Sequence, residues 1–237
     1  MYSFVIPTMW MSNRLSYMLE QYEADDNVQE VIIIDNKTES AIDLSPYKKV
    51  VHLPQEKNIF VNPAWNLGVS VAKSEYVVIC NDDITFDSKS LNEFLLNEIN
   101  ESIIGTHPVS FFEDHDTVYI DDGSYTGLGW GVLMYMKKKN YIQIPDEFKI
   151  WFGDDILALN SNNVKSLVTN IETEMSTTVR NEFANKTIQN DVLNLLQLTR
   201  KFNVYESGKK GLQEGIRQVW FNGFREEVQS RVESLQP

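Results

Sequence analysis

The sequence predicts an α/β fold with a mostly parallel β-sheet flanked by helices. Residues 1–100 alternate short apolar runs with segments of helical periodicity, which is typical of a parallel sheet with covering helices. The run Tyr76–Asp83 begins as a continuous apolar stretch, which favours a strand covered on both faces, and ends in one amide and two carboxylates. The run Val28–Asp35 also ends in an acid. Because ligands of open α/β sheets bind at the carboxyl ends of the strands, these polar ends form the first candidate site.

The earliest elements follow from proline placement and helical spacing. Ser3–Pro7 predicts a short strand that the proline ends, and Ser12 is the expected cap of the helix that follows. The apolar residues of that helix are spaced to face one side. They are Leu15, Met18, Leu19 and Tyr22. Val50–Leu53 predicts a third, shorter strand after Val28–Asp35.

The next elements continue the alternation. Asn62 followed by Pro63 predicts a helix start, with the asparagine as N-cap and the proline at the first helical position. This helix leads to Ala72 and directly into the strand Tyr76–Asp83. A further helix beginning near Ser88 has one apolar face. Its members are Leu91, Phe94, Leu95 and Ile99, and the strand Ser102–Thr106 comes after it.

The strand end at Asn81, Asp82 and Asp83 has two interpretations. Carboxylate and amide oxygens suit a hard divalent cation such as Mg²⁺ or Mn²⁺, which prefers oxygen ligands and shares its coordination shell with phosphate. Alternatively, the three residues form a turn and cap the helix that begins near Ser88, since Asn and Asp are common in both places. The residues themselves leave both interpretations open.

The composition of the sequence changes from Phe111 onward, where turn residues and glycines become frequent. Gly127, Gly129 and Gly131 surround the entry to the apolar run Trp130–Met136, which indicates backbone that turns tightly or approaches a ligand closely, or simply a loop.

A second acid pair lies further along this region. Asp154 and Asp155 precede an apolar segment and predict the first turn of a short helix. Acids there complement the helix dipole, or one of them serves as a base. Trp130 and Trp151 are candidates for stacking on a substrate, and buried packing is an equally good explanation for each.

Beyond Asn160 the sequence contains two amphipathic stripes that predict helices packed on the core or on a partner. Ile188, Val192, Leu195, Leu196 and Phe202 form one, and Leu212, Ile216, Val219, Trp220, Phe224, Val228 and Val232 form the other. We therefore divide the chain into an α/β domain at 1–160 and a mostly helical extension at 161–237. The α/β domain has a first half at 1–100 and a second half at 101–160.

Composition restricts the partners and the compartment. A net charge of −13, from 34 acidic and 21 basic residues, repels phosphate backbones and anionic membranes and counts against both as partners. The single cysteine, Cys80, excludes an internal disulfide and lies in an apolar run, which predicts a buried thiol and a reducing compartment. No apolar run approaches the ~18–20 residues needed to span a bilayer, and no basic leader precedes one. We expect a cytoplasmic protein.

Between Ser3 and Ile156 the order of these signals resembles the GT-A glycosyltransferases, within them the family-2-like group that uses nucleoside diphosphate sugars. Five segments carry the resemblance. Phe4–Thr8 resembles the family's opening strand, and Val31–Asn36 resembles the strand whose last Asp recognises the base of the nucleotide. Asn58–Gly68 resembles the helix before the metal-binding strand, and Asn81–Asp83 occupies the place of the D-x-D motif. Gly153–Asp155 resembles the segment with the acid pair that includes the catalytic base. The resemblance implies a GT-A (Rossmann-like) fold and makes 1–160 the catalytic domain, with the donor bound by 1–100 and the acceptor by 101–160.

The resemblance also implies roles for single residues on the donor side. Asp83 is the expected ligand of Mn²⁺ or Mg²⁺, and Asp82 or Asn81 is expected to hold the ribose or a metal-bound water. The base of the nucleotide, with UDP as the family-based choice, is expected to contact Asp35, beside Pro7 and Thr8. Asn58 and Asn66 are further donor-binding candidates.

On the acceptor side the resemblance implies that Asp155 takes the proton of the acceptor hydroxyl in a single inverting displacement, with Asp154 as the other candidate. Trp130, Gly131 and Trp151 are the expected substrate contacts.

The sequence also departs from the family pattern at three places. Asn81 replaces the first acid of D-x-D, and Asp154 stands where many members have Glu. The usual metal-binding His is missing from the segment Glu172–Thr178, where Glu174 can supply an oxygen ligand instead.

Two other functions share some of these features. Sugar nucleotidyltransferases also place acids at strand ends, but they usually have a glycine-rich N-terminal loop with basic residues, whereas Thr8–Asn13 has no glycine and only Arg14 nearby. A non-catalytic binding or scaffold protein with a degenerate GT-A domain predicts no turnover and no metal-dependent nucleotide binding. The acceptor stays open among saccharides, proteins and, less favoured by the acidic charge, a modified DNA base. A chain without a membrane anchor fits a soluble acceptor better than a lipid.

Overall fold

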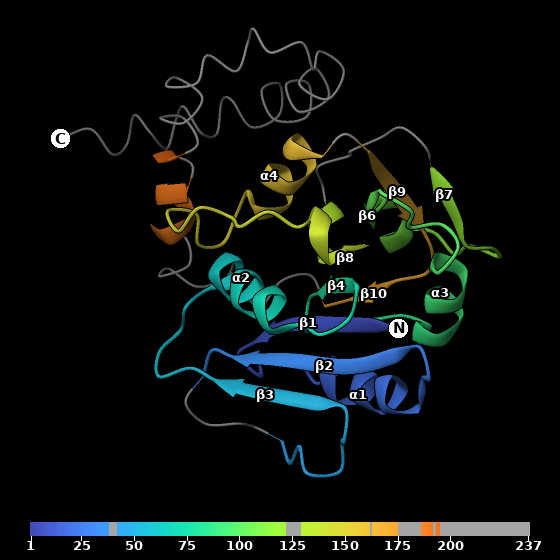
Figure 1. Ribbon diagram of the computed structural model, residues 1–237, viewed down its shortest axis with the longest axis horizontal. Helices are drawn as coiled ribbons and strands as arrows, with labels where there is room; N and C mark the ends of the chain where they lie inside the picture. The colour runs from blue at the N-terminus through green and yellow to red at the C-terminus, as the bar shows by residue number, and fades with distance from the viewer. Residues whose placement is uncertain (38–41, 122–128, 162, 175–185, 192, 195–237) are drawn as a thin grey trace, which may run out of the picture.

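One eight-stranded sheet runs through the protein in the order β3-β2-β1-β4-β8-β6-β9-β7, and a two-stranded sheet pairs β10 with β5 (Figure 1). The computed structural model describes residues 1–37, 42–121, 129–161, 163–174, 186–191 and 193–194. The elements are β1 (Tyr2–Thr8), α1 (Arg14–Ala24), β2 (Val28–Asp35), β3 (Val50–Pro54), α2 (Val61–Val71), β4 (Tyr76–Cys80), β5 (Ile84–Thr85), α3 (Ser88–Leu95), β6 (Ile103–Thr106), the 3₁₀ turn η1 (Pro108–Phe111), β7 (Tyr119–Asp121), η2 (Trp130–Val132), β8 (Leu133–Lys137), η3 (Lys138–Asn140), α4 (Gly153–Asn160), β9 (Val164–Val168) and β10 (Glu172–Thr173). Residues 186–191 are also helical.

The first four strands of the large sheet, β3, β2, β1 and β4, are all parallel. Parallel pairing directs their carboxyl ends to one edge, as the alternation of strands and helices predicts. The other half of the sheet is mixed. β8 is antiparallel to both of its neighbours, β6 and β9 are parallel, and β7 is antiparallel to β9. The predicted α/β architecture is confirmed.

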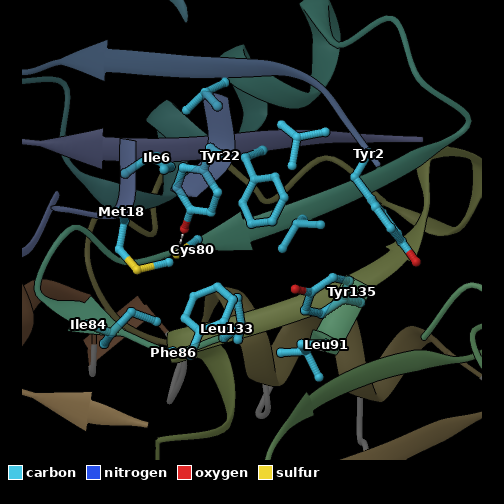
Figure 2. Close-up of a cluster of buried hydrophobic side chains, with 14 of the residues drawn as sticks. Tyr2, Ile6, Met18, Tyr22, Cys80, Ile84, Phe86, Leu91, Leu133 and Tyr135 are labelled. Carbon is cyan, nitrogen blue, oxygen red and sulfur yellow. Dashed lines mark hydrogen bonds between the residues drawn. The ribbon is translucent and has the colours of Figure 1, made fainter. Parts of the chain in front are cut away.

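The core has two parts, one on each face of the sheet. Alternate residues of a strand point to opposite faces. Accordingly Phe4 and Ile6 of β1 join the cluster under α1 and α3, whereas Val5 between them joins the cluster under α2 and α4. Figure 2 shows the first cluster, in which the Tyr22 hydroxyl lies 3.5 Å from the Cys80 sulfur. Both side chains are buried, as the sequence predicts for Cys80.

Helix periodicity is confirmed, whereas some predicted caps are wrong. Leu15, Met18, Leu19 and Tyr22 are the buried residues of α1. The N-cap of α1 is Asn13 and not Ser12. The N-cap of α2 is Phe60 and not Asn62, because the Asn62 side chain turns into the protein and donates from Nδ2 to the Trp151 carbonyl. The alternative that Asn81–Asp83 cap α3 is also wrong, since Asp87 accepts from the Ser90 N–H.

The domain boundary predicted at residue 160 falls inside the sheet. Strand β9 inserts between β6 and β7, and β10 pairs with β5 directly after Asp83. The extension therefore supplies part of the main domain. Of the predicted C-terminal stripes, Ile188 is buried on the helical segment 186–191, and the remaining members lie outside the described residues. None of the helices in the described ranges is both long enough and apolar enough to cross a membrane.

Candidate active site

Polar side chains from three parallel strands meet at the carboxyl edge of the sheet. Thr8 at the end of β1 is in register with Asp35 at the end of β2, and the Asn36 N–H donates to the Thr8 carbonyl at 2.9 Å. On the other side of β1, the Thr8 hydroxyl donates to Asp82 Oδ2 at 2.6 Å. The structure thus brings together Thr8, Asp35 and Asp82, which the sequence predicted separately.

Asp82 is a partly buried acid beside a second acid. Desolvation, together with the neighbouring charge of Asp83, raises its pKa to about 6, against hydrogen bonds from Thr8 and from the backbone N–H of Met9. These bonds fix the orientation of the carboxylate. The site therefore holds two adjacent carboxylates whose negative charges repel each other, and a bound cation would reduce this repulsion.

Asp83 lies next to Glu174 in the fold. Asp83 is buried, and its carbonyl accepts from the Glu174 N–H at 3.1 Å where β10 pairs with β5. The Glu174 carboxylate, however, lies 3.6 Å from Arg14 Nε. In the described part of the chain, no three or more His, Cys, Asp and Glu side chains gather as metal ligands. The residues fit a cation through the Asp82–Asp83 oxygens, and Glu174 is adjacent to them by its backbone.

Asp35 is held by two donors. Its Oδ1 accepts from the Lys37 N–H at 3.0 Å, and its Oδ2 lies 2.9 Å from His52 Nε2. The carboxyl group is almost fully buried, whereas His52 is partly exposed. His52 was not among the predicted site residues. The parallel register of β3 beside β2 is the signal that could have found it, because it places His52 opposite Ile33, two residues before Asp35.

The segment after β3 folds back over the exit of β1. Asn58 Oδ1 accepts from the Phe60 N–H at 2.7 Å, and its Nδ2 contacts the sulfur of Met9 at 3.5 Å. The Ile59 N–H donates to Asn36 Oδ1. Asn58 therefore lies beside the loop that follows Pro7 and Thr8, in the region where the nucleotide base was predicted to bind.

A second acidic centre lies at the start of α4. Asp154 and Asp155 occupy its first turn, as predicted. Burial raises the pKa of Asp154 to about 6, while N–H groups of Asp154, Asp155 and Gly131 lower it. A Cβ on Gly131 would lie 2.7 Å from Asp154 Oδ2, so only glycine allows this approach. The close approach at Gly131 is thus to Asp154, and the substrate contact of Gly131 stays a prediction.

The backbone joins the two acidic centres. Asp154 packs on Gly131, and the carbonyl of the next residue, Val132, accepts from the Asn81 N–H at 2.9 Å. Asn81 in turn directly precedes Asp82. The acids at the end of β4 and those at the start of α4 therefore lie at one edge of the sheet, linked through the segment that enters β8.

Three other predicted residues have mainly packing contacts. Trp130 is fully buried, its ring covers Gly105, and its Nε1 donates to the Lys165 carbonyl. A ring with no exposed surface favours the packing explanation for Trp130 over stacking. Asn66 holds the segment after η3, through bonds with Tyr141 and Ile144.

Trp151 is half-buried, and its carbonyl accepts from Asn62, a site-supporting residue that the cap assignment had misplaced. The stacking role of Trp151 stays a prediction.

The comparisons with known proteins agree with this geometry. The family model "Glycosyl transferase family 2" matches residues 3–117. This segment, just under half of the chain, is similar to family 2 glycosyltransferases. The match spans the strands that present Thr8, Asp35 and Asp82. A comparison with curated proteins finds no match.

Solved structures show that the glycosyltransferase domain has the GT-A fold predicted above. TarS from S. aureus aligns with a TM-score of 0.57 and 15% identity over 82% of this chain and 39% of that one. TarS 1–349 in complex with UDP-GlcNAc aligns with a TM-score of 0.57 and 14% identity over 82% of this chain and 66% of that one. HddC from Yersinia pseudotuberculosis aligns with a TM-score of 0.50 and 17% identity over 72% of this chain and 92% of that one. The chain thus spans well under half the length of the longer TarS chain.

Proposed function

We propose that this protein transfers a sugar from a nucleoside diphosphate sugar, with UDP as the nucleotide, to a hydroxyl acceptor with inversion, in a reaction that depends on Mn²⁺ or Mg²⁺. The family 2 domain supports nucleotide-sugar transfer. The similarity in fold to a structure that contains UDP-GlcNAc supports the choice of UDP. A saccharide or protein acceptor is more compatible with a net charge of −13 than a modified DNA base is.

The donor half of the proposed site lies on β1 and β2. Asp35 and Thr8 stand at adjacent strand ends, with Pro7 before them and Asn58 beside the following loop. We assign the base to Asp35 and this loop, because a carboxylate fixed by two hydrogen bonds is a preorganised acceptor for a ring N–H. Asn66 is left out, since its amide is used by a neighbouring segment.

The diphosphate half of the proposed site is the end of β4. Asp83 and Asp82 would hold the divalent ion, with Glu174 as an additional oxygen donor once it separates from Arg14. When bound, this ion supplies Lewis-acid stabilisation of the charge on the leaving diphosphate. Asn81 would orient the ribose or a bound water.

The acceptor half of the proposed site is the start of α4. We assign the general base to Asp155, because it matches the second residue of the acid pair in the family that the sequence resembles, and it lies in the first turn of α4 beside Asp154. A base in this position takes the proton from the acceptor hydroxyl as the oxygen attacks the sugar carbon, and the diphosphate leaves from the opposite face.

One observation carries the proposal: the Asn81–Val132 hydrogen bond and the Gly131–Asp154 contact join the two acidic centres at a single edge. A transferase that works by direct displacement needs its leaving-group site and its base within one pocket. A scaffold protein has no such requirement.

The test is calorimetric titration of UDP and of GDP, each with and without Mn²⁺, on the wild type, on Asp83→Asn and on Asp83→Ala. We expect UDP binding that requires Mn²⁺ and is lost in both variants. Asp26→Asn is the matched control, because Asp26 is an exposed acid in the turn before β2, at the opposite edge of the sheet. It should bind as the wild type does.

Turnover then separates enzyme from scaffold. A panel of UDP-sugars is incubated with Mn²⁺, and UDP release is measured for the wild type and for Asp155→Asn. Release by the wild type that falls on the order of 10²-fold in the variant supports the assigned base. A folded wild type that binds neither nucleotide refutes the donor site and favours the scaffold alternative, and binding without any turnover refutes the proposed sugar transfer.

A further inference from the structure

A buried carboxylate outside the predicted site binds the loop that leads into α4. Asp191, on the helical segment 186–191, is fully buried. Its Oδ1 accepts from the Lys149 N–H at 2.9 Å, and its Oδ2 accepts from the N–H groups of Ile150 at 2.8 Å and of Trp151 at 3.0 Å. Three consecutive backbone donors thus converge on one side chain.

This arrangement requires a carboxylate. Burying a charged group is costly unless hydrogen bonds compensate, and successive backbone N–H groups form a concave site for an anion. An asparagine has a single acceptor oxygen, so it could not serve donors on both sides of the group. The same segment is attached a second time, because Asn194 Nδ2 donates to the Glu147 carbonyl at 2.9 Å.

The carbonyl side of the same loop is fixed by Asn62. The Asn62 N–H donates to the Lys149 carbonyl at 3.0 Å, and its Nδ2 donates to the Trp151 carbonyl at 2.9 Å. Asp191 therefore holds the donors, and Asn62 holds the acceptors, of one short stretch of backbone. This stretch cannot shift without breaking bonds on one side or the other.

The residue that follows the loop explains why it needs to be fixed. Phe152 has φ +67°, a left-handed conformation that residues with a Cβ rarely adopt, and it is buried at the N-cap of α4. Such a conformation persists only when its surroundings impose it. It sets the direction in which α4 begins, and Asp154 and Asp155 are in the first turn of that helix.

We propose that Asp191 is a positioning residue for sugar transfer: by binding the N–H groups of Lys149–Trp151 it fixes the start of α4 and thereby the two acids of the acceptor half. This inference rests on the proposed function. It assigns to the segment after residue 185 a direct part in the geometry of the catalytic domain.

The test compares Asp191→Asn and Asp191→Ala with the wild type. We expect UDP affinity in the presence of Mn²⁺ and KM for the hydrolysed UDP-sugar to stay at wild-type values, because the donor half lies on other strands. The kcat is expected to fall on the order of 10²-fold in Asp191→Ala, as small misplacements of catalytic groups do, and less in Asp191→Asn. Asp146→Asn is the matched control, since Asp146 is an exposed acid in the same loop.

The outcomes are distinct. A wild type that neither binds UDP nor releases it from UDP-sugars refutes the proposed function, and this inference falls with it. An active wild type with unchanged kcat in both Asp191 variants refutes the inference alone. Variants that remain folded by circular dichroism but lose UDP binding together with turnover also refute it, because they indicate a general structural role in place of positioning.

Discussion

Replacing Asp82 with asparagine is expected to stabilise the protein at neutral pH and to have a much smaller effect in acid. Burial raises the pKa of Asp82 from its ordinary value of 3.8 to about 6, with Asp83 adding to the effect. A carboxyl group whose pKa is higher in the folded state binds its proton more tightly there. Below about pH 4 the group is largely protonated in both states and costs little. Between about pH 4 and pH 6 the unfolded state releases the proton that the folded state retains, so the unfolding free energy falls over this window, and the loss is complete above about pH 6.

The size of the effect follows from the two pKa values. They differ by about 2, and each pKa unit corresponds to about 1.4 kcal/mol, so the penalty at about pH 7.5 has an upper limit of ~3 kcal/mol. Asparagine keeps an oxygen that accepts from the Thr8 hydroxyl and carries no charge. We compare the unfolding free energy of the variant with that of the wild type at each pH. This difference should be ~1–3 kcal/mol more in favour of the variant at about pH 7.5 than at about pH 4.

The assay is urea unfolding followed by circular dichroism at both pH values, with a chelator present so that no divalent ion neutralises the acids. Asp26→Asn is the control for the general effect of removing one negative charge from an acidic protein. If the difference between variant and wild type is the same at both pH values, Asp82 is not the destabilising group that its burial indicates, and the charge argument for a cation at this strand end loses its basis.

Two further outcomes are expected. Gly131→Ala places a Cβ 2.7 Å from Asp154 Oδ2. Overpacking of this kind costs ~1–3 kcal/mol of unfolding free energy, measured by thermal melts, and should reduce UDP-sugar turnover. An unchanged melting curve with full activity would contradict the contact. Cys80 is buried with its pKa raised to about 12, so alkylation of the native protein by iodoacetamide should be on the order of 10²-fold slower than in urea; equal rates in native and unfolded protein would show that the thiol is accessible.

The local part of the fold could be predicted from the sequence because it depends on local patterns. The apolar run before Asn81 and the helical spacing of α1 are properties of short segments, and both elements formed as expected. The gathering of polar strand ends at one edge also followed, since parallel strands present their carboxyl ends together, whereas the contact of Thr8 with Asp82 depends on the pairing of β1 with β4.

The parts that were missed depend on long-range pairing. The segment Val164–Val168 is short and contains polar residues, so nothing local identifies it as β9 between two distant strands. Asn62 before Pro63 has every local feature of a cap, and only the arrival of the loop at Trp151 explains why its side chain turns inward. Asp191 is one of many acids in the sequence, and its three N–H partners lie some forty residues earlier in the chain.

The antiparallel strand β8 has a consequence for protein synthesis. It lies between β4 and β6 in the sheet, yet it leaves the ribosome after both of them. At ~5–20 residues per second, a nascent chain presents the apolar β4 for several seconds before its partner emerges. During that time the edge of β4 offers unpaired backbone groups to any other strand.

A fragment that ends at residue 117, where the family match stops, would lack β8 entirely and keep the β4 edge open. Such a fragment is expected to aggregate, so the smallest independently folding unit must extend beyond the recognisable family segment, at least through Lys137.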